Sequence, residues 1–386
     1  MSANRLFGYT DDQRLIAESV PPLLRNALPP QKVRELDEAS MFPEDAYQAL
    51  ARAGWMGLPY PVESGGTGGS YKDLAVFVET VAYHNVQLAS AWLTSVIYGG
   101  MQLCANASPQ LRESVLPGVI DGSVKLALCI TEPDTGSDVA SIRTRAAAQG
   151  DEYVISGQKI YITCAHVADH LVVATKTDPA TGHRGITLFL VDAKSAGLSI
   201  RPLKGLGRRM IHTNEVFFNN VRVPAARRIG ELNQGWKALM RGLNLERLCL
   251  SASAVGNMRR IIDYARDFAR DRKQFGKPIA AHQAVAHKFA EMQILYESSS
   301  ALLHRAAEML DAGLSPTLET AATKVHCTES NIRCADAGMQ VMGGAGWMAE
   351  HEMQMYYRDC RVGTIGGGTS EIMKNIIAKQ MELEAR

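Results

Sequence analysis

The sequence has almost no net charge and no long apolar run. Its 386 residues include 41 Lys and Arg against 40 Asp and Glu, a formal net charge of +1, and the basic residues form no dense run. Binding several phosphates in a row requires such a run, so we expect no nucleic-acid partner. No stretch approaches the roughly 18 uninterrupted apolar residues of a membrane span, and the N-terminal residues lack the apolar core of a secretory signal. We therefore expect a cytoplasmic protein with no membrane span.

Several common site signatures are also absent. The seven cysteines include no CxxC spacing, and their odd number argues against a disulfide framework, which indicates a reducing compartment. No GxxxxGK[ST] phosphate loop occurs, and neither KGLGRRM nor GGAGWM completes a GxGxxG fingerprint, so a Rossmann nucleotide site has no support. His166 and His170 have the spacing of a helical metal pair, but they lie in a strand-like region. We interpret them as loop histidines and expect no metal.

The hydrophobic period divides the chain into three parts. The first third has helical spacing, the middle has the period of two that is typical of strands, and the remainder is helical again over long segments. A chain of this length needs two or three hydrophobic cores. We predict an α+β multidomain protein with a helical domain at 1–121, a β domain at 122–232 and a helical bundle at 233–386.

Three consecutive glycines, Gly366 to Gly368, interrupt a helical region in the segment RVGTIGGGTSEI. Glycine allows backbone conformations and close approaches that other residues do not, so this loop is predicted to press its amides against a ligand. The Thr-Ser-Glu sequence that follows is typical of a helix start, where anions are favoured. Since glycine carries no acid or base, catalysis at this loop requires a side chain from elsewhere.

Glu246 is the carboxylate that the helical pattern singles out. The residues at i−7, i−3, i+3, i+4 and i+8 are apolar or small, namely Leu239, Leu243, Cys249, Leu250 and Ala254. No Lys or Arg stands three or four residues away. An unpaired carboxylate in such a stripe is costly when ionised, so its pKa should rise toward that of a general base at neutral pH. A long-range salt bridge to another helix is the alternative interpretation of the same pattern.

Three further segments carry polar or aromatic side chains at turns. The segment TEPDTGSD follows a predicted strand and offers the hydroxyls of Thr131 and Ser137 to a polar ligand. The segment YITCA places Tyr161 and Thr163 on one face of a strand, which suits a flat heterocycle. A third segment, RDRKQFGKPIAAHQ, breaks a helix and contains Arg272, Phe275 and Gln283. An ordinary turn, a chance pair and a helix corner explain the same patterns without a ligand.

Six motifs in one order resemble the acyl-CoA dehydrogenase family over nearly the whole chain. They are TEPDTGSD, YIT, RKQFGKPI, QVMGGAGW, YRDCR and GGGTSEI, between Thr131 and Ile372. The resemblance implies an N-terminal helical domain, a middle β domain and a C-terminal four-helix bundle. It also implies FAD, held between the last two domains and a neighbouring subunit, and hence a homotetramer or at least a dimer.

The resemblance assigns cofactor roles to the residues that match. They are Thr131, Ser137, Tyr161, Thr163, Arg272, Phe275, Gln283, Gln340, Gly344, Thr369 and Glu371. The first four would contact the flavin ring, and Ser137 would also contact the substrate. The next five would grip the dinucleotide across a subunit boundary, and the last two would lie at the pyrophosphate, where a helix start favours anions.

The glycine triplet departs from the commonest pattern of the family. Most members have Tyr-Glu-Gly-Thr there and use that Glu as the catalytic base, but this chain has Gly367 in its place. A minority, resembling the isovaleryl-CoA and long-chain acyl-CoA dehydrogenases, carry the base on a bundle helix immediately before an Arg. The segment LERL places Glu246 before Arg247 there. The resemblance and the helical pattern therefore select the same residue.

The implied reaction is the α,β-dehydrogenation of an acyl-CoA to a trans-2-enoyl-CoA. Glu246 would remove the α proton while the β carbon passes hydride to flavin, and the Gly367 amide with an FAD ribityl hydroxyl would hold the thioester oxygen. An electron-transfer flavoprotein would take the electrons. Asn244 and Arg247 would face the CoA side, although family members often carry Asp at the first position.

One further segment bears on the expected length of the acyl chain, beside the position of the base. SVIYGGMQL lies on the helix that closes the acyl pocket in the family, and Gly99-Gly100 would leave room for a longer or branched chain. We therefore expect a branched or medium-to-long acyl-CoA. One alternative is a relative that uses the same scaffold for oxidase or non-redox acyl-CoA chemistry. Another is a non-catalytic flavoprotein or nucleic-acid-binding relative in which Glu246 only anchors helices.

Overall fold

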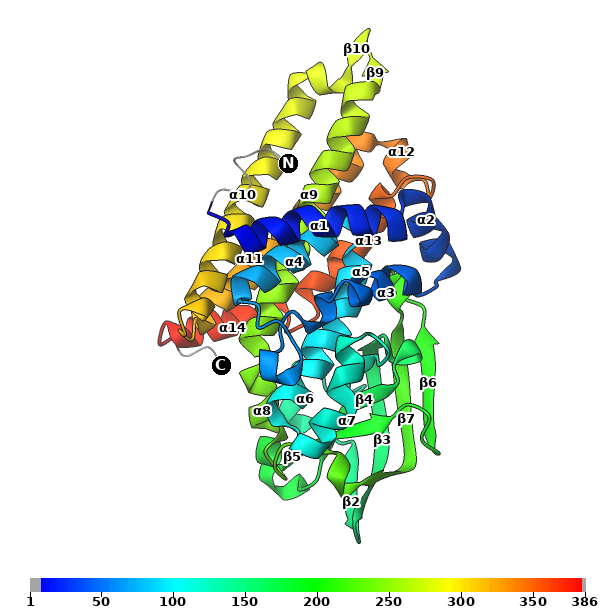
Figure 1. The fold of residues 1–386 in the computed structure, drawn as a ribbon. Coiled ribbons are helices and arrows are strands. Elements are labelled where there is room, and N and C mark those ends of the chain that lie inside the picture. The colour runs from blue at the N-terminus through cyan, green and yellow to red at the C-terminus, as the bar shows by residue number, and fades with distance from the viewer. Residues whose placement is uncertain (1–7, 384–386) are drawn as a thin grey trace. The chain divides into compact units, whose positions relative to one another are not determined.

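The computed structural model describes residues 8–383, which form two compact units (Figure 1). Of these residues, the first unit draws on 8–35, 70–89 and 244–383, and the second on 36–69 and 90–243. Helices α2 (Pro30–Ala39) and α5 (Val86–Trp92) carry the chain from one unit to the other. Each unit is thus assembled from segments that lie far apart in the sequence.

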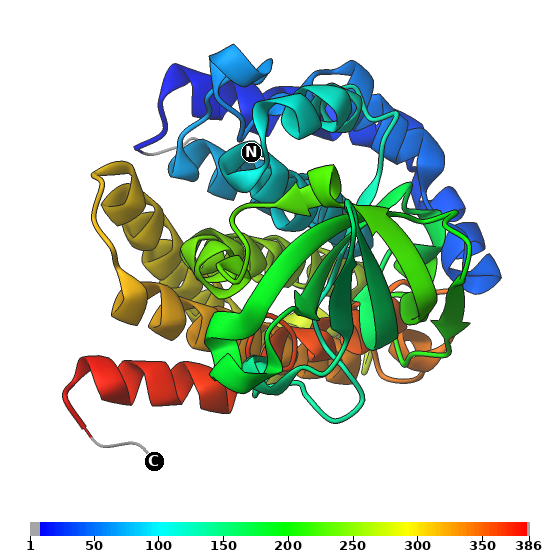
Figure 2. The ribbon, with the colours of Figure 1, turned by 90° about the horizontal axis from the view of Figure 1, so that it is seen from below.

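The second unit is built around an eight-stranded sheet. Its strand order is β6-β7-β3-β2-β4-β5-β8, and β1 pairs in parallel with β4 beside this path. The strands are β1 (Leu126–Cys129), β2 (Arg145–Gln149), β3 (Glu152–Thr163), β4 (His170–Lys176), β5 (Ile186–Asp192), β6 (Leu198–Leu203), β7 (Thr213–Pro224) and β8 (Arg228–Ile229). The twist of the strands is visible in Figure 2. One face of the sheet buries a core that includes Ile155, Phe189 and Val221.

Helices of the second unit precede and follow this sheet. They are α3 (Glu44–Arg52), α6 (Met101–Asn106), α7 (Pro109–Ile120) and α8 (Gly235–Arg241). A π-helical segment, Leu93–Gly100, runs directly into α6 and packs against β1. Wide turns of this kind are rare and are often found at functional sites.

The first unit is a bundle in which three helices are long. These are α9 (Leu243–Asp271), α10 (Gln283–Asp311) and α11 (Thr317–Met342), and α10 packs against α11. The shorter helices are α1 (Asp11–Ala27), α4 (Tyr71–His84), α12 (Gly344–Trp347), α13 (Met353–Cys360) and α14 (Ser370–Gln380). A hairpin of β9 (Lys273–Gln274) and β10 (Lys277–Pro278) joins α9 to α10 and lies at the far end of both helices in Figure 1.

Side-chain caps fix where several of these helices begin. Thr10 caps α1 and Ser70 caps α4, each in a reciprocal capping box. Thr369 caps α14, because its hydroxyl accepts a hydrogen bond from the amide of Ile372 at 3.2 Å. This last cap sets the point at which the glycine loop passes into a helix.

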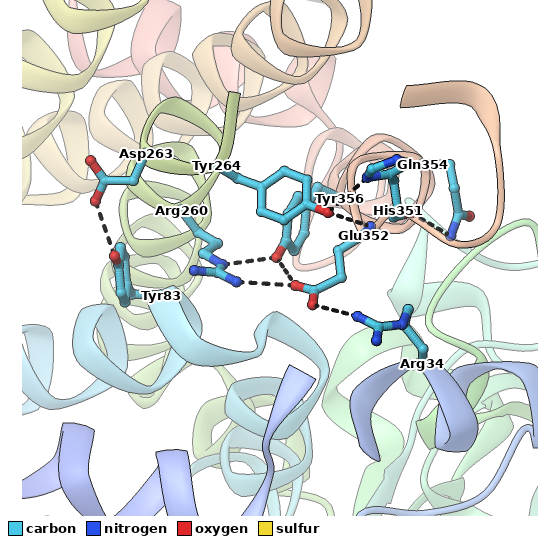
Figure 3. Close-up of polar contacts among 9 residues, drawn as sticks. All are labelled: Arg34, Tyr83, Arg260, Asp263, Tyr264, His351, Glu352, Gln354 and Tyr356. Carbon is cyan, nitrogen blue, oxygen red and sulfur yellow. Dashed lines mark hydrogen bonds and ion pairs between the residues drawn. The ribbon is translucent and has the colours of Figure 1, made fainter. Parts of the chain in front are cut away.

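A buried polar network ties α9 to α13 within the first unit (Figure 3). Arg260 of α9 donates to the Tyr356 hydroxyl at 2.8 Å and to the Glu352 carboxylate at 3.2 Å. Tyr356 donates to the same carboxylate, and the guanidinium of Arg34 lies 3.5 Å from it. Because a buried charge that loses its partner is costly, the network holds α13 against α9. It thereby fixes the start of the segment that leads to the glycine loop.

The predicted order of helical, β and helical parts is confirmed, as is the helix start at Thr369. The limits at 121 and 232 stay predictions, since the compact units regroup segments across them. Within residues 8–383 no helix is both long and apolar enough to cross a membrane. All seven cysteines are free, and six of them are buried.

Candidate active site

Glu246 lies in the first turn of α9, and its carboxylate has no hydrogen bond or ion pair with any residue that the structure describes. Burial raises the pKa of this carboxyl to about 7, while the charges of Arg247 and Lys324 act to lower it. A carboxyl that titrates near neutral pH can accept a proton there and release it again, as a general base must. The alternative interpretation, a salt bridge to another helix, is not realised within residues 8–383.

The glycine loop lies directly against this carboxylate. Gly367 and Gly368 both have left-handed backbones, with φ of +64° and +87°. A Cβ built on Gly367 would overlap the side chain of Leu250 and would lie 3.3 Å from Oε1 of Glu246. Glycine at this position therefore makes room for a carboxylate that arrives from α9, and the two positions cannot both carry an acidic side chain without rearrangement.

The loop presents an open backbone donor beside Glu246. The Gly366 amide donates to the carbonyl of Val362 at 2.8 Å. The Gly367 amide, by contrast, has no acceptor among the residues that the structure describes. A free amide next to a proton acceptor is the arrangement that stabilises developing negative charge on a carbonyl oxygen.

Asn244 and Arg247 hold the start of α9 to α11. Arg247 is buried, with 5% of its surface exposed, and donates to Oδ1 of Asn244 at 3.2 Å. The hydroxyl of Thr320 on α11 donates to the same oxygen at 3.1 Å. Both predicted CoA-facing residues are thus engaged within the chain, where they fix the turn that carries Glu246.

Lys324 is a residue of this site that the sequence patterns did not identify. It is fully buried on α11, and its ammonium donates to the carbonyl of Gly368 at 2.6 Å. Burial lowers its pKa to about 8, while the charge of Glu246 acts to raise it. The available signal was a lone Lys among small and apolar residues in TAATKVHC.

In the second unit, Glu132 fastens the TEPDTGSD loop to the sheet. Its buried carboxylate accepts hydrogen bonds from the amides of Arg143 at 2.6 Å and Thr144 at 2.8 Å. It also pairs at 2.8 Å with Lys159 of β3, which is itself fully buried and donates to the carbonyl of Ile130 at 2.8 Å. This pair was also missed, although it sets the position of the residues on either side of it.

The four predicted flavin contacts of the second unit lie on the two segments that this pair joins, the TEPDTGSD loop and β3. The carbonyl of Thr131 accepts a hydrogen bond from the amide of Ile160 at 2.9 Å, and Ser137 lies exposed in the same loop. Tyr161 occupies a β-bulge with φ of +61°, and 64% of its surface is exposed. The bulge breaks the strict alternation from which a common face of Tyr161 and Thr163 was predicted, so that facing stays a prediction.

The predicted dinucleotide contacts of the first unit are all exposed. They are Arg272, Phe275, Gln283, Gln340 and Gly344, at the β9–β10 hairpin, at the start of α10 and between α11 and α12. Phe275 has 94% of its surface exposed and forms the hairpin turn together with Gly276. The ring of Phe275 is therefore open to a ligand or to another chain.

Thr369 and Glu371 stand at the beginning of α14. The Ser370 hydroxyl between them is buried, and no described residue bonds to it. Hydrogen bonds to its own backbone amide and to Thr369 keep the pKa of Glu371 below its usual value. The first-turn amides of this 11-residue helix and the unpartnered hydroxyl form a setting that suits a phosphate group.

Comparisons with known proteins agree over almost the whole chain. Family models match at residues 10–123 (acyl-CoA dehydrogenase, N-terminal domain), 127–221 (middle domain) and 233–382 (C-terminal domain). The caffeyl-CoA reductase-Etf complex subunit CarC of Acetobacterium woodii is 33% identical over 374 residues, which cover 96% of this chain and 98% of that protein. Cyclohex-1-ene-1-carbonyl-CoA dehydrogenase of Geobacter metallireducens is 35% identical over 376 residues, with coverages of 96% and 98%. The structure of butyryl-CoA dehydrogenase from Megasphaera elsdenii has a TM-score of 0.93 at 26% identity and covers 97% of this chain and 99% of that one.

The fold and these matches define an oxidoreductase that acts on CH–CH donors. The chain belongs to the acyl-CoA dehydrogenase family, which is FAD-dependent. Its residues fit that cofactor: Tyr161 and Phe275 expose ring faces for flat groups, and the start of α14 offers amides to a pyrophosphate.

The expectation of extra space at Gly99-Gly100 is wrong. A Cβ on Gly99 would lie 2.5 Å from Cβ of Leu126, and one on Gly100 would overlap the hydroxyl of Tyr60. Tyr60 is buried and donates to the carbonyl of Val96 at 2.7 Å, and both features hold its ring in place. These glycines permit close packing of the π-helical segment, and Leu126 and Tyr60 fill the space beside them.

Proposed function

We propose that the chain dehydrogenates an acyl-CoA between its α and β carbons, with Glu246 as the catalytic base. The observation that carries this proposal is a carboxylate with a pKa near 7 that lies against Gly367 without a paired cation. The commoner position of the base in the family is closed here, because any side chain at Gly367 would displace Leu250.

Proton abstraction requires support for the thioester as well as a base. Glu246 accepts the α proton, which becomes acidic only when a donor stabilises the charge that develops on the thioester oxygen. The open amide of Gly367 is the donor that this chain offers beside the carboxylate. Its direction is set by the backbone alone, so it is preorganised and needs no side chain.

FAD, when bound, supplies what no side chain can: it accepts two electrons and the hydrogen from the β carbon. We propose that Thr131, Ser137, Tyr161 and Thr163 contact its ring system from the second unit. The dinucleotide part is assigned to Arg272, Phe275, Gln283, Gln340, Gly344, Thr369 and Glu371. The first five of these are exposed on the single chain, and we propose that a neighbouring subunit of a homotetramer covers them, as the family resemblance implies.

The remaining partners follow from the same proposal. CoA would contact Ser137 and the turn that Asn244 and Arg247 hold. The electron acceptor would be an electron-transfer flavoprotein, since the A. woodii relative is a subunit of a caffeyl-CoA reductase-Etf complex. Seven free cysteines are consistent with the reducing cytoplasm.

The test is anaerobic bleaching of the bound flavin by a panel of acyl-CoAs. Because the base lies on α9, as in the isovaleryl-CoA and long-chain relatives, we expect branched or medium-to-long acyl groups to bleach fastest. The panel should include cyclic and aryl acyl groups, and an enoyl-CoA added to the reduced enzyme tests the reverse direction. Oxygen consumption without an added acceptor would favour the oxidase alternative, and a flavin that no acyl-CoA bleaches would contradict the proposal.

The bleaching rate should rise with pH through about 7. Glu246 must be ionised to take the α proton, and burial raises its pKa to about 7, so the active form is the minor one at pH 6 and the major one at pH 8. Stopped-flow bleaching at substrate concentrations well below saturation, from pH 5.5 to 9, measures this pKa in the free enzyme. A rate that is flat over this range, or that falls as pH rises through 7, would contradict the assignment.

A further inference from the structure

Lys324 is a buried ammonium whose position the reaction described so far does not explain. None of its surface is exposed, and no carboxylate of the described chain lies within ion-pair distance of it. Its ammonium donates instead to a backbone carbonyl, that of Gly368, at 2.6 Å. A buried cation without a paired anion is costly, so its retention indicates a use.

The geometry connects this ammonium to the proposed base in two ways. The carbonyl it holds belongs to the residue after Gly367, whose Cβ position lies 3.3 Å from Oε1 of Glu246. Its charge also reaches the same carboxylate from a second helix, α11. The hydrogen bond and the charge of Lys324 therefore act on the same loop and on the carboxylate beside it.

Few other charged groups surround the pair. Arg247 and the thiol of Cys249 act with Glu246 from α9, and Lys324 faces it from α11. The charges of Glu329, on the same helix, and of Glu371, on α14, also act to raise the pKa of Lys324. Arg247 is already engaged by Asn244, which leaves Lys324 as the cation that both holds the loop and acts on the charge of the carboxylate.

We propose that Lys324 is a positioning residue for the catalytic base: it anchors the glycine loop through the Gly368 carbonyl and supplies the positive charge that faces Glu246 from α11. The inference rests on the proposed role of Glu246. Lys324 touches neither the thioester nor the flavin in this scheme. It acts through the direction of the Gly367 amide and through the ionisation of the carboxylate.

Neutral variants should shift the ionisation of Glu246 upward. Burial raises the pKa of Glu246 and the charge of Lys324 lowers it. Removing that charge should therefore raise the pKa above 7. A rise of one unit from 7 leaves about fivefold less ionised carboxylate at pH 7. We expect Lys324→Gln and Lys324→Met to bleach about fivefold more slowly at pH 7 and to recover most of the rate at pH 9. Lys324→Met, which cannot bond to Gly368, should in addition weaken binding of the substrate.

The decisive measurement is an infrared titration of the flavin-loaded enzyme. The carboxyl band that is lost in Glu246→Gln reports protonation of Glu246 directly, without turnover. Its midpoint should move up in both neutral variants, return toward the parent value in Lys324→Arg, and stay unchanged in Lys379→Met, which removes an exposed lysine of α14. Flavin content and melting temperature identify any variant that has not folded.

The outcomes separate this inference from the function on which it rests. An unchanged midpoint in folded Lys324→Gln and Lys324→Met would overturn the role of Lys324 even if Glu246→Gln is inactive. Normal bleaching by Glu246→Gln would overturn the base assignment, while a shifted midpoint would still establish the coupling. Should neither neutral variant fold, the parent enzyme decides, because the charge of Lys324 acts on the ionised carboxylate as well. The stretching frequency of the Glu246 carboxylate should then shift as Lys324 loses its proton at alkaline pH, and a frequency that stays constant up to pH 10 would reject the proposal.

Discussion

Replacing Glu246 by Gln should lower the rate of flavin bleaching by roughly 10²–10⁴-fold, the usual contribution of a general base. Gln has nearly the same shape and leaves Leu250 and Gly367 in place, but it cannot accept the α proton. Bound flavin and the affinity for a non-reactive acyl-CoA analogue should stay close to those of the parent enzyme. Anaerobic stopped-flow absorbance measures the rate, and the flavin spectrum measures the occupancy.

A matched control is Glu291→Gln, the same change at an exposed position of α10. It should bleach at the parent rate. Undiminished bleaching by Glu246→Gln would reject the assignment, and loss of flavin together with activity would indicate a structural role for Glu246 instead.

Glu246→Gln should gain stability at the same time as it loses activity. A carboxyl whose pKa is raised to about 7 in the folded state binds protons more tightly there than in the unfolded chain. Its contribution to stability is therefore full below the unfolded pKa and is lost as pH rises through 7. Glu246→Gln should accordingly raise the melting temperature at pH 8 relative to the parent and leave it nearly unchanged at pH 4.5. Gain of stability with loss of activity is the expected pattern for a strained catalytic group.

Glu246 could be found from the sequence because its signal is local. A carboxylate in an apolar helical stripe is visible from spacings of three and four residues, and the glycine triplet shows that another group must act there. Lys324 stands among small and apolar residues, but the roles of Lys324 and Lys159 depend on their partners, which stand 44 and 27 residues away in the sequence. The sequence patterns did not identify residues whose role depends on tertiary contacts.

The order of helical and β parts was likewise predictable, because periods of 3.6 and 2 differ over any long segment. The grouping into two compact units was not, since it joins residues 70–89 to a bundle that begins at residue 244. Gly99-Gly100 illustrates the same limit at a single site. A glycine pair indicates either open space or close packing, and only the positions of Leu126 and Tyr60 decide between them.

Replacing Lys159 by Met should destabilise the second unit by about 3–5 kcal/mol, the usual cost of removing one partner from a buried ion pair. Burial raises the pKa of Glu132, but Lys159 and the backbone amides of Arg143 and Thr144 outweigh it and hold that pKa below its usual value. Without the Lys159 ammonium, the Glu132 carboxylate stays buried and keeps only its hydrogen bonds to the two backbone amides. We expect the melting temperature to fall by on the order of 10 °C and flavin to be retained less well, because Thr131 and Ser137 lose their anchor.

Two comparisons show that the defect arises from the stranded carboxylate. With Lys159 absent, the folded-state pKa of Glu132 rises above the unfolded one, so the lost stability should be partly regained as pH falls from 8 to 5. Asp134→Asn removes an ion pair with Arg143 in the same loop, where the two side chains are 74% and 78% exposed, and should change stability by no more than about 0.5 kcal/mol. Calorimetry of the three proteins at both pH values measures the effect. A Lys159→Met protein that melts with the parent at pH 8 would show that the Glu132 loop is held by contacts other than this pair.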